Sequence, residues 1–224
     1  MKFLSIKIIV YILLLLGLQC KIFSQEKDFS AGFMAAGNGI DIRGESSSFW
    51  RGTNNDTWGG LGISGGIFCE RYLFKRFLAA LQIRYIQKGS TYQFVNNFNE
   101  TQREALRIQY IEVPILVGYK IKPKEGKGYC IVQAGIAYAQ SISSKYIFNE
   151  FAENTKKAEM ENFKNKDISI VASLKVPLNE SGKNNFFLGL SASWSLLSIH
   201  KYYDLRNLCY GLELSYVFFS KDIK

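Results

Sequence analysis

Residues 106–121 read LRIQYIEVPILVGYKI, and this stretch decides the fold class. It is rich in β-branched and aromatic residues, which favour an extended strand. Pro114 argues against a buried helix, because proline removes a helical N–H and clashes with the preceding turn, whereas a strand tolerates it at a bulge or an edge. Alternate side chains of a strand share a face, so Glu112 lies opposite Val113 and Ile115. We expect Glu112 to have a cationic partner, because an unpaired buried charge is strongly destabilising.

Seven other segments alternate between apolar and small or polar residues in the same way. The eight expected strands cover residues 29–36, 57–70, 77–89, 106–121, 129–141, 167–176, 186–196 and 207–219. Their connections alternate between short turns and the longer segments 38–56, 90–105, 143–166 and 198–206. This alternation is typical of outer-membrane barrels. The sequence therefore predicts an all-β, eight-stranded antiparallel up-and-down transmembrane β-barrel with short periplasmic turns and long extracellular loops.

The residue composition of the two strand faces indicates which face contacts lipid and which faces the barrel interior. One face carries bulky apolar residues, and the other is mostly Gly, Ser and Ala, as at 60–66 and 189–195. Small residues make a poor water-facing surface but fit inside a narrow barrel. A soluble lipocalin-like barrel, with its apolar face inward around a ligand, is the alternative. The face composition favours lipid outside and small residues inside.

The N-terminus has the pattern of an export signal. Lys2 and Lys7 precede the apolar run 8–18, which is followed by polar residues and Ser24. That run is too short to cross a bilayer as a helix, so residues 1–24 are expected to be a cleaved signal peptide and 25–224 the barrel domain. Removing residues 1–24 leaves 25 basic and 19 acidic residues, a net charge near +6. An exported protein does not meet the genome, so this charge suits anionic lipopolysaccharide headgroups better than nucleic acid.

Two segments carry a resemblance to a known family. The run YIEVPILVGYK at 110–120 resembles the Y-[IL]-E-[IV]-P-[IL]-L-[LV]-x-Y segment of the PorT-like outer-membrane β-barrel family, and residues 79–89 are similar to its L-x-x-x-L-x-Y-x-x-K-G strand. The resemblance covers most of the chain after the signal peptide. It implies an outer-membrane barrel and, more specifically, accessory service to protein secretion across the outer membrane.

Few charges have inward parity, and three of them are expected to meet. Arg84 and Glu112 lie on neighbouring strands near mid-height, and Glu213 on the last strand could reach the same level. We predict a lumenal ion-pair cluster of Arg84, Glu112 and Glu213 that plugs the barrel. The alternative is a charged constriction that selects ions in a small pore. Eight strands leave a lumen only just wide enough for side chains, which favours the plug.

The chain shows little sign of catalytic chemistry. Ser198, His200 and Glu213 are the residue types of a hydrolase constellation, but their order is reversed and Glu213 has inward parity. We therefore expect no enzyme activity. Cys69, Cys130 and Cys209 have no metal-type spacing and are expected to be small packing residues, and no cofactor or metal is predicted.

The expected role is a structural or interaction anchor that presents its extracellular loops to lipopolysaccharide or to other envelope or secretion proteins. Trp50, Phe148 and Phe151 are the candidate partner contacts on these loops. The helical spacing of Phe148, Phe151 and Ala152 suggests a short amphipathic helix within 145–166. A small ion or solute pore is the alternative function.

Overall fold

The computed structural model describes residues 29–44, 59–74, 76–95, 101–122, 128–148, 156–159, 162–178 and 185–220. The predicted signal peptide and the candidate contacts Trp50 and Phe151 lie outside these ranges. Within them, no helix is long and apolar enough to cross a membrane.

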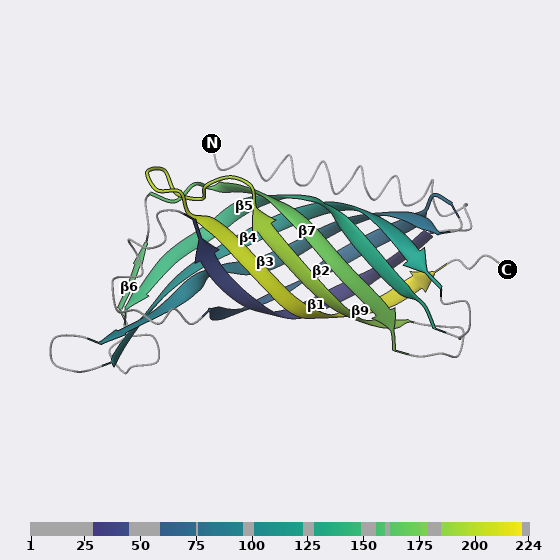
Figure 1. Ribbon diagram of the computed structural model, residues 1–224, viewed down its shortest axis with the longest axis horizontal. Helices are drawn as coiled ribbons and strands as arrows, with labels where there is room; N and C mark the ends of the chain where they lie inside the picture. The colour runs from purple at the N-terminus through teal and green to yellow at the C-terminus, as the bar shows by residue number, and fades with distance from the viewer. Residues whose placement is uncertain are drawn as a thin grey trace.

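The described residues form nine strands. Their bounds are β1 Phe29–Arg43, β2 Gly60–Tyr72, β3 Phe77–Val95, β4 Thr101–Ile121, β5 Cys130–Phe148, β6 Lys156–Glu159, β7 Lys166–Pro177, β8 Phe186–Ser195 and β9 Arg206–Ser220. Eight of them pair antiparallel in the order β4-β3-β2-β1-β9-β8-β7-β5, and β5 pairs back with β4 (Figure 1). The sheet is therefore a closed eight-stranded up-and-down barrel, as predicted. The ninth strand, β6, pairs with Lys145–Phe148 at the end of β5.

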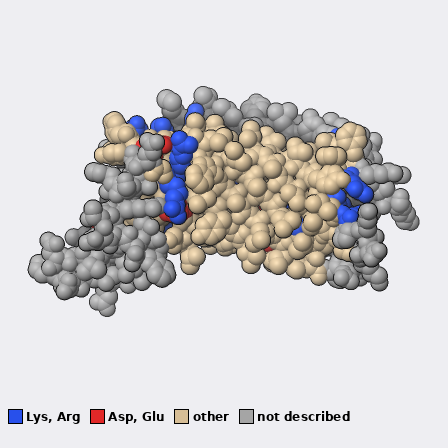
Figure 2. Space-filling view, viewed as in Figure 1, with Lys and Arg blue, Asp and Glu red and all other residues tan. Residues whose placement is uncertain are grey.

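Side chains alternate strictly across the barrel wall. On β8, Phe186, Leu190 and Trp194 are exposed, whereas Phe187, Ser193 and Ser195 are buried. Leu61 on β2 is 81% exposed, and many other large apolar residues are exposed in the same way. Figure 2 shows these residues as a broad belt without charge, bordered at both ends by basic groups. Such a belt is stable only against an apolar solvent, which means lipid.

The two ends of the barrel differ. The first and last strands meet where Ser30 pairs with Ser220. Strands β2, β4 and β7 end, and β3, β5 and β8 begin, at this end of the barrel, called here the turn end. At the opposite end, β3, β4 and β5 are 19, 21 and 19 residues long, about twice what a bilayer requires. They run past the other strands and, with β6, form a projecting sheet, called here the extension (Figure 1).

The extension corrects the predicted loops 90–105 and 143–166. Strand β3 continues to Val95, β4 begins at Thr101, and β5 continues to Phe148. The predicted helix is wrong at Phe148, which is a strand residue paired with Glu104 and Lys156. The sequence of these continuations lacks the long apolar alternation that marks a membrane strand, so that pattern did not predict them.

Candidate functional site

The lumen contains the buried charges of the barrel, and four of them form a mid-barrel cluster of Arg84, Lys88, Glu112 and Asp167. Arg84 Nε and Nη2 lie 2.9 and 2.5 Å from Glu112 Oε1. Lys88 Nζ lies 2.6 Å from Glu112 Oε2 and 3.2 Å from Asp167 Oδ2. Two cations balance two carboxylates, so the cluster is formally neutral while all four side chains are buried.

Strand register brings these side chains together. Arg84 pairs with Glu112, Glu112 with Ala139, and Ala139 with Asp167, so the four residues form one row across β3, β4, β5 and β7. Ala139 is small and leaves room in the middle of the row. Lys88, four residues further along β3, fills it with its ammonium group between the two carboxylates.

Neighbouring polar groups complete the cluster. Ser195 Oγ donates to Asp167 Oδ2 at 2.8 Å, and Asn207 Nδ2 donates to the same oxygen at 3.1 Å. Lys88 Nζ also lies 5.4 Å from the centroid of the Tyr110 ring, within range of a cation–π interaction. The charges are thus held by β3, β4, β7, β8 and β9 together. Such a network fills the lumen at mid-height.

A second group of charges, the turn-end cluster, consists of Glu70, Lys175 and Glu213. Lys175 Nζ lies 3.2 Å from Glu70 Oε1 and 3.6 Å from Glu213 Oε1. Gln133 Nε2 donates to Glu70 Oε1 at 3.0 Å, and Ser215 Oγ donates to Glu213 Oε1 at 2.8 Å. One cation therefore serves two carboxylates, in contrast to the balanced cluster above it.

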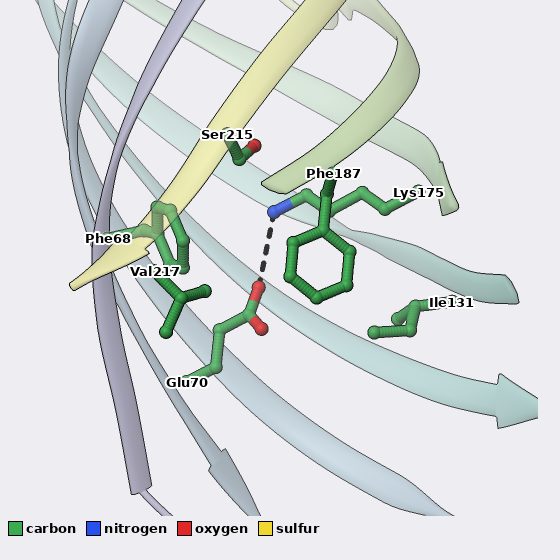
Figure 3. A pocket seen from close by; sticks show the side chains of 7 residues that line it. All are labelled: Phe68, Glu70, Ile131, Lys175, Phe187, Ser215 and Val217. Atoms are coloured by element: carbon green, nitrogen blue, oxygen red, sulfur yellow. Dashed lines mark hydrogen bonds and ion pairs between the residues drawn. The ribbon is translucent and has the colours of Figure 1, made fainter. Parts of the chain in front are cut away.

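The turn-end cluster borders a small hollow (Figure 3). Its volume is about 190 Å³, including space shared with solvent. The lining side chains are Phe68, Glu70, Ile131, Lys175, Phe187, Ser215 and Val217. Lys175 Nζ also lies 4.7 Å from the centroid of the Phe68 ring. The space that water could occupy in it is about 10 Å³, roughly that of one water molecule, so the hollow has no room for a drug-sized ligand.

The placement of Glu213 corrects the predicted three-residue cluster. Arg84 and Glu112 are in contact, but Glu213 lies beside Lys175. Lys175 pairs with Gly189 and Gly189 pairs with Glu213, so the two side chains face each other across a residue with no side chain. The inward parity of Glu213 was predicted correctly. Its height was not, because height depends on the register of every strand around the barrel.

Two carboxylates of these two clusters were missed by the sequence reasoning. Glu70 continues the inward alternation of Gly66 and Phe68 on β2, and Asp167 precedes Ser169 on the inward face of β7. Both lie at a predicted strand end, where alternation is easily cut short. Continuing the inward alternation by two more residues would have identified both carboxylates as inward-facing.

A layer of buried apolar residues lies toward the extension end of the barrel. It is contributed by the barrel wall, by Phe163 between β6 and β7, and by the connection between β8 and β9. Its members include Ile40, Ile42, Leu106, Ile108, Phe163, Ile199, Leu205 and Cys209. Ile199 is fully buried, and its amide donates to the carbonyl of Leu205 at 2.7 Å. The connection 196–205 thus folds over the barrel as a cap.

His200 and Ser198 hold this cap together. The Ser198 hydroxyl lies 2.7 Å from the carbonyl oxygen of Tyr203 and 3.1 Å from that of His200. His200 Nδ1 accepts hydrogen bonds from the amides of Tyr202 and Tyr203 at 3.1 and 3.2 Å. Burial, together with the positive charges of Lys164 and Lys201, lowers the pKa of His200. Ser198 bonds to backbone groups, and Glu213 lies in the turn-end cluster, so the three hydrolase-type residues do not form one constellation.

The other residues considered in the sequence analysis form no metal site within the described part of the chain. No three His, Cys, Asp or Glu side chains there are placed to hold a metal ion. Cys130 and Cys209 are free thiols, and Cys209, on β9, packs in the apolar layer beneath the cap. Phe148, the one candidate partner contact within the described ranges, ends β5 on the extension.

A closed antiparallel barrel with an apolar outside and a polar, side-chain-filled inside defines an integral outer-membrane β-barrel protein. The family "Outer membrane protein beta-barrel domain" matches residues 23–201, and the chain belongs to this family. The match is to the broad family, and the PorT-like resemblance stays a prediction. No curated protein matches the chain.

Several solved structures are similar at low identity. Ail, the attachment invasion locus protein of Yersinia pestis, is 10% identical with a TM-score of 0.44, over 86% of this chain and 100% of that one. Neisserial surface protein A is 8% identical with a TM-score of 0.46, over 85% and 99%. OprG from Pseudomonas aeruginosa is 9% identical with a TM-score of 0.38, over 86% and 95%.

Proposed function

We propose that the protein is a non-conducting anchor of the outer membrane that presents its extension to partners outside the cell. The observation that supports the proposal is the burial of paired charges and apolar side chains inside the barrel. Lys88, Glu112 and Asp167 are at most 1% exposed at mid-height, and the apolar cap lies between them and the extension end. Ions cross a pore through water or through a replacement for their hydration shell, and an ion-paired, capped lumen offers neither.

The extension is the surface that a partner would meet. In bacterial barrels the short turns face the periplasm and the long connections face outside, so β3 to β6 project from the cell surface. The extension has internal bonds of its own, since the Tyr146 hydroxyl donates to Glu104 across β4 and β5. A rigid sheet loses little conformational entropy on binding, which suits a presenting role.

A secretion-accessory role is a more specific version of this proposal. It is supported by the PorT-like runs at 79–89 and 110–120 alone. Both runs lie in β3 and β4 within the barrel wall, so they specify the scaffold rather than the presented surface. We therefore treat secretion components as one class of partner for the extension, beside lipopolysaccharide and other envelope proteins.

Planar-bilayer recording tests the closed lumen. The refolded barrel should give no steady single-channel steps, whereas steady steps in the wild type would favour the small pore. A useful positive control removes the blockage. This control is the variant K88A/E112A/D167A/I199A/L205A, which lacks three charged side chains of the mid-barrel cluster and two apolar side chains of the cap. It should conduct if the barrel still folds.

Photo-crosslinking in whole cells tests the presenting role. A photoreactive residue at Trp50, Phe148 or Phe151 should capture the same discrete species repeatedly. The matched control is Ile136, which is exposed on the apolar belt and should capture lipid only. Capture of nothing from all three outer positions, with the barrel present in the membrane, would contradict the anchor role.

A further inference from the structure

Three buried side-chain oxygens in the middle of the lumen have no hydrogen-bond partner within the described part of the chain. They are Asp167 Oδ1, Ser169 Oγ and Asn207 Oδ1. Asp167 and Ser169 are 0% exposed, and Asn207 is 1% exposed. Buried polar groups almost always bond to the protein or to an ordered water, because an unsatisfied one is strongly unfavourable. The three oxygens therefore mark a site that the surrounding side chains do not satisfy.

Strand register gathers these side chains. Ser169 pairs with Ser195, and Ser195 Oγ accepts a hydrogen bond from the Asn207 amide at 3.2 Å, so the three residues form one row across β7, β8 and β9. Asp167 lies two residues from Ser169 on the same inward face of β7. Its carboxylate extends across the row, because Ser195 Oγ and Asn207 Nδ2 both donate to Asp167 Oδ2. The unpartnered oxygens thus belong to neighbouring groups.

The Asp167 carboxylate is used unevenly. Ser195 Oγ, Asn207 Nδ2 and Lys88 Nζ lie 2.8, 3.1 and 3.2 Å from Oδ2. Three donors therefore converge on one oxygen, while Oδ1 has none among the described residues. An ionised carboxylate has two oxygens that both accept hydrogen bonds. A further donor is needed on the side of Asp167 that faces away from Lys88.

The orientation of the Asn207 amide is fixed by its neighbours. Its Nδ2 donates to Asp167 Oδ2 and lies 3.5 Å from the Tyr110 hydroxyl. Rotating the amide by half a turn would place its oxygen against the carboxylate, where both atoms only accept. Asn207 Oδ1 therefore points away from these partners and also needs a donor.

The unsatisfied set consists of two acceptors and one hydroxyl, which is the set that a water molecule satisfies. Water donates two hydrogens and accepts in return, and a buried water typically makes about three hydrogen bonds. One water bridges polar atoms up to about 5.5 Å apart, since each bond is about 2.8 Å long. An alkali cation suits the site less well. The mid-barrel cluster is already neutral, so an added cation would be an uncompensated buried charge.

We propose that Asp167 Oδ1, Asn207 Oδ1 and Ser169 Oγ hold one ordered water molecule inside the barrel. The water donates to the carboxylate and to the amide oxygen, and it accepts from the Ser169 hydroxyl. It joins β7 to β9 across β8 and completes the bonding of the carboxylate that holds Lys88. This site goes beyond the anchor role and does not depend on what the extension binds.

A crystal structure of the refolded full-length barrel tests the site, with crystals grown in rubidium chloride and diffracting well enough to show ordered water. We expect a solvent peak within hydrogen-bond distance of all three oxygens and no anomalous rubidium signal there. A rubidium signal would assign the site to an alkali cation and overturn the proposal. A direct hydrogen bond from Ser169 Oγ to Asp167 Oδ1, with no peak between them, would also overturn it.

Nuclear Overhauser spectroscopy in detergent micelles tests the same site without crystals. The variant S169A is used, because alanine has no hydroxyl proton that exchanges with water and two of the three partners remain. The Ala side chain at position 169 should show a cross-peak to water with the sign of a long-lived contact. Leu116, which is 1% exposed in the apolar part of the lumen, is the control and should show none. Absence of the peak at 169, or equal peaks at both positions, would contradict an isolated water.

Discussion

Lys88 Nζ lies 2.6 Å from Glu112 Oε2, and neither side chain is more than 1% exposed. A buried charge of this kind is tolerated only with a partner, because removal from water costs several kcal/mol per ion. Glu112 satisfies two cations at once, since its other oxygen contacts Arg84. The pairing therefore makes the stability of the barrel depend on one carboxylate.

Replacing Glu112 with Gln should destabilise the folded barrel. The change leaves Lys88 and Arg84 with excess positive charge in the lumen, and breaking one side of a buried pair typically costs about 3–5 kcal/mol. We expect a lower unfolding temperature on cold gels and a lower urea midpoint in lipid vesicles. Glu104→Gln on the same strand is the control, because Glu104 lies on the extension, and its effect should be below about 1 kcal/mol. An unchanged unfolding temperature for E112Q would remove the mid-barrel cluster from this account.

The turn-end cluster predicts opposite signs for two substitutions. Lys175→Met leaves Glu70 and Glu213 close together without a cation, so the free energy of unfolding should fall by about 3 kcal/mol or more. Glu213→Gln leaves one cation and one carboxylate, and stability should stay the same or rise. Urea titration of both variants in vesicles measures the difference. A loss for E213Q as large as that for K175M would contradict the one-to-two charge arrangement.

The cap should loosen as pH falls. The pKa of His200 is lowered in the folded protein, so the unfolded chain binds more protons near pH 6 and stability rises with pH. Below the lowered pKa, Nδ1 becomes protonated and can no longer accept the amides of Tyr202 and Tyr203. The ratio of the measured to the intrinsic exchange rate of these two amides should therefore rise as the pH is lowered from 7 to 5. The His200→Gln variant should lack this extra change, and an identical pH profile in both proteins would refute the role of His200.

Trimming the cap should expose the thiol of Cys209. Ile199 and Cys209 belong to the same buried layer, and removing most of the Ile199 side chain leaves a cavity beside it. With Cys69 and Cys130 replaced by Ser, Ile199→Ala should label faster with a water-soluble maleimide than the parent. Leu190→Ala removes an exposed side chain of β8 outside the cap and should label at the parent rate. Rapid labelling of the parent itself would show that the cap does not exclude water.

The sequence predicted whether a side chain points into the barrel better than it predicted the side chain's height along the barrel axis. Parity is local, so the inward positions of Arg84, Glu112 and Glu213 followed from alternation along their own strands. Height depends on cross-strand register, and Glu213 reaches Lys175 through Gly189 rather than Arg84. The contact between Arg84 and Glu112 could be predicted because β3 and β4 are consecutive and pair directly. Contacts across the lumen, such as Lys175 with Glu70, involve strands far apart in the chain.

The extension was unpredictable for a different reason. Successive residues at 101–104 and 156–159 are mostly charged or polar, so the sequence there shows no two-residue apolar period. The β-branched and aromatic residues at 91–95 and 146–148 were the available β-forming signals. Sequence alone therefore gave the membrane part of the strands and missed their continuation into water.

A nitroxide scan along β8 tests the orientation of the barrel wall most directly. Single cysteines at 187–194, in a background with Cys69, Cys130 and Cys209 replaced by Ser, are spin-labelled in vesicles, and collision rates with oxygen and with a water-soluble nickel complex are measured. The side chains at 186, 188, 190, 192 and 194 point outward in the structure. Oxygen accessibility should therefore be high at the even positions and low at the odd ones, with little access for nickel at either. High nickel access at the even positions would place them in water and contradict the assignment of this face to lipid.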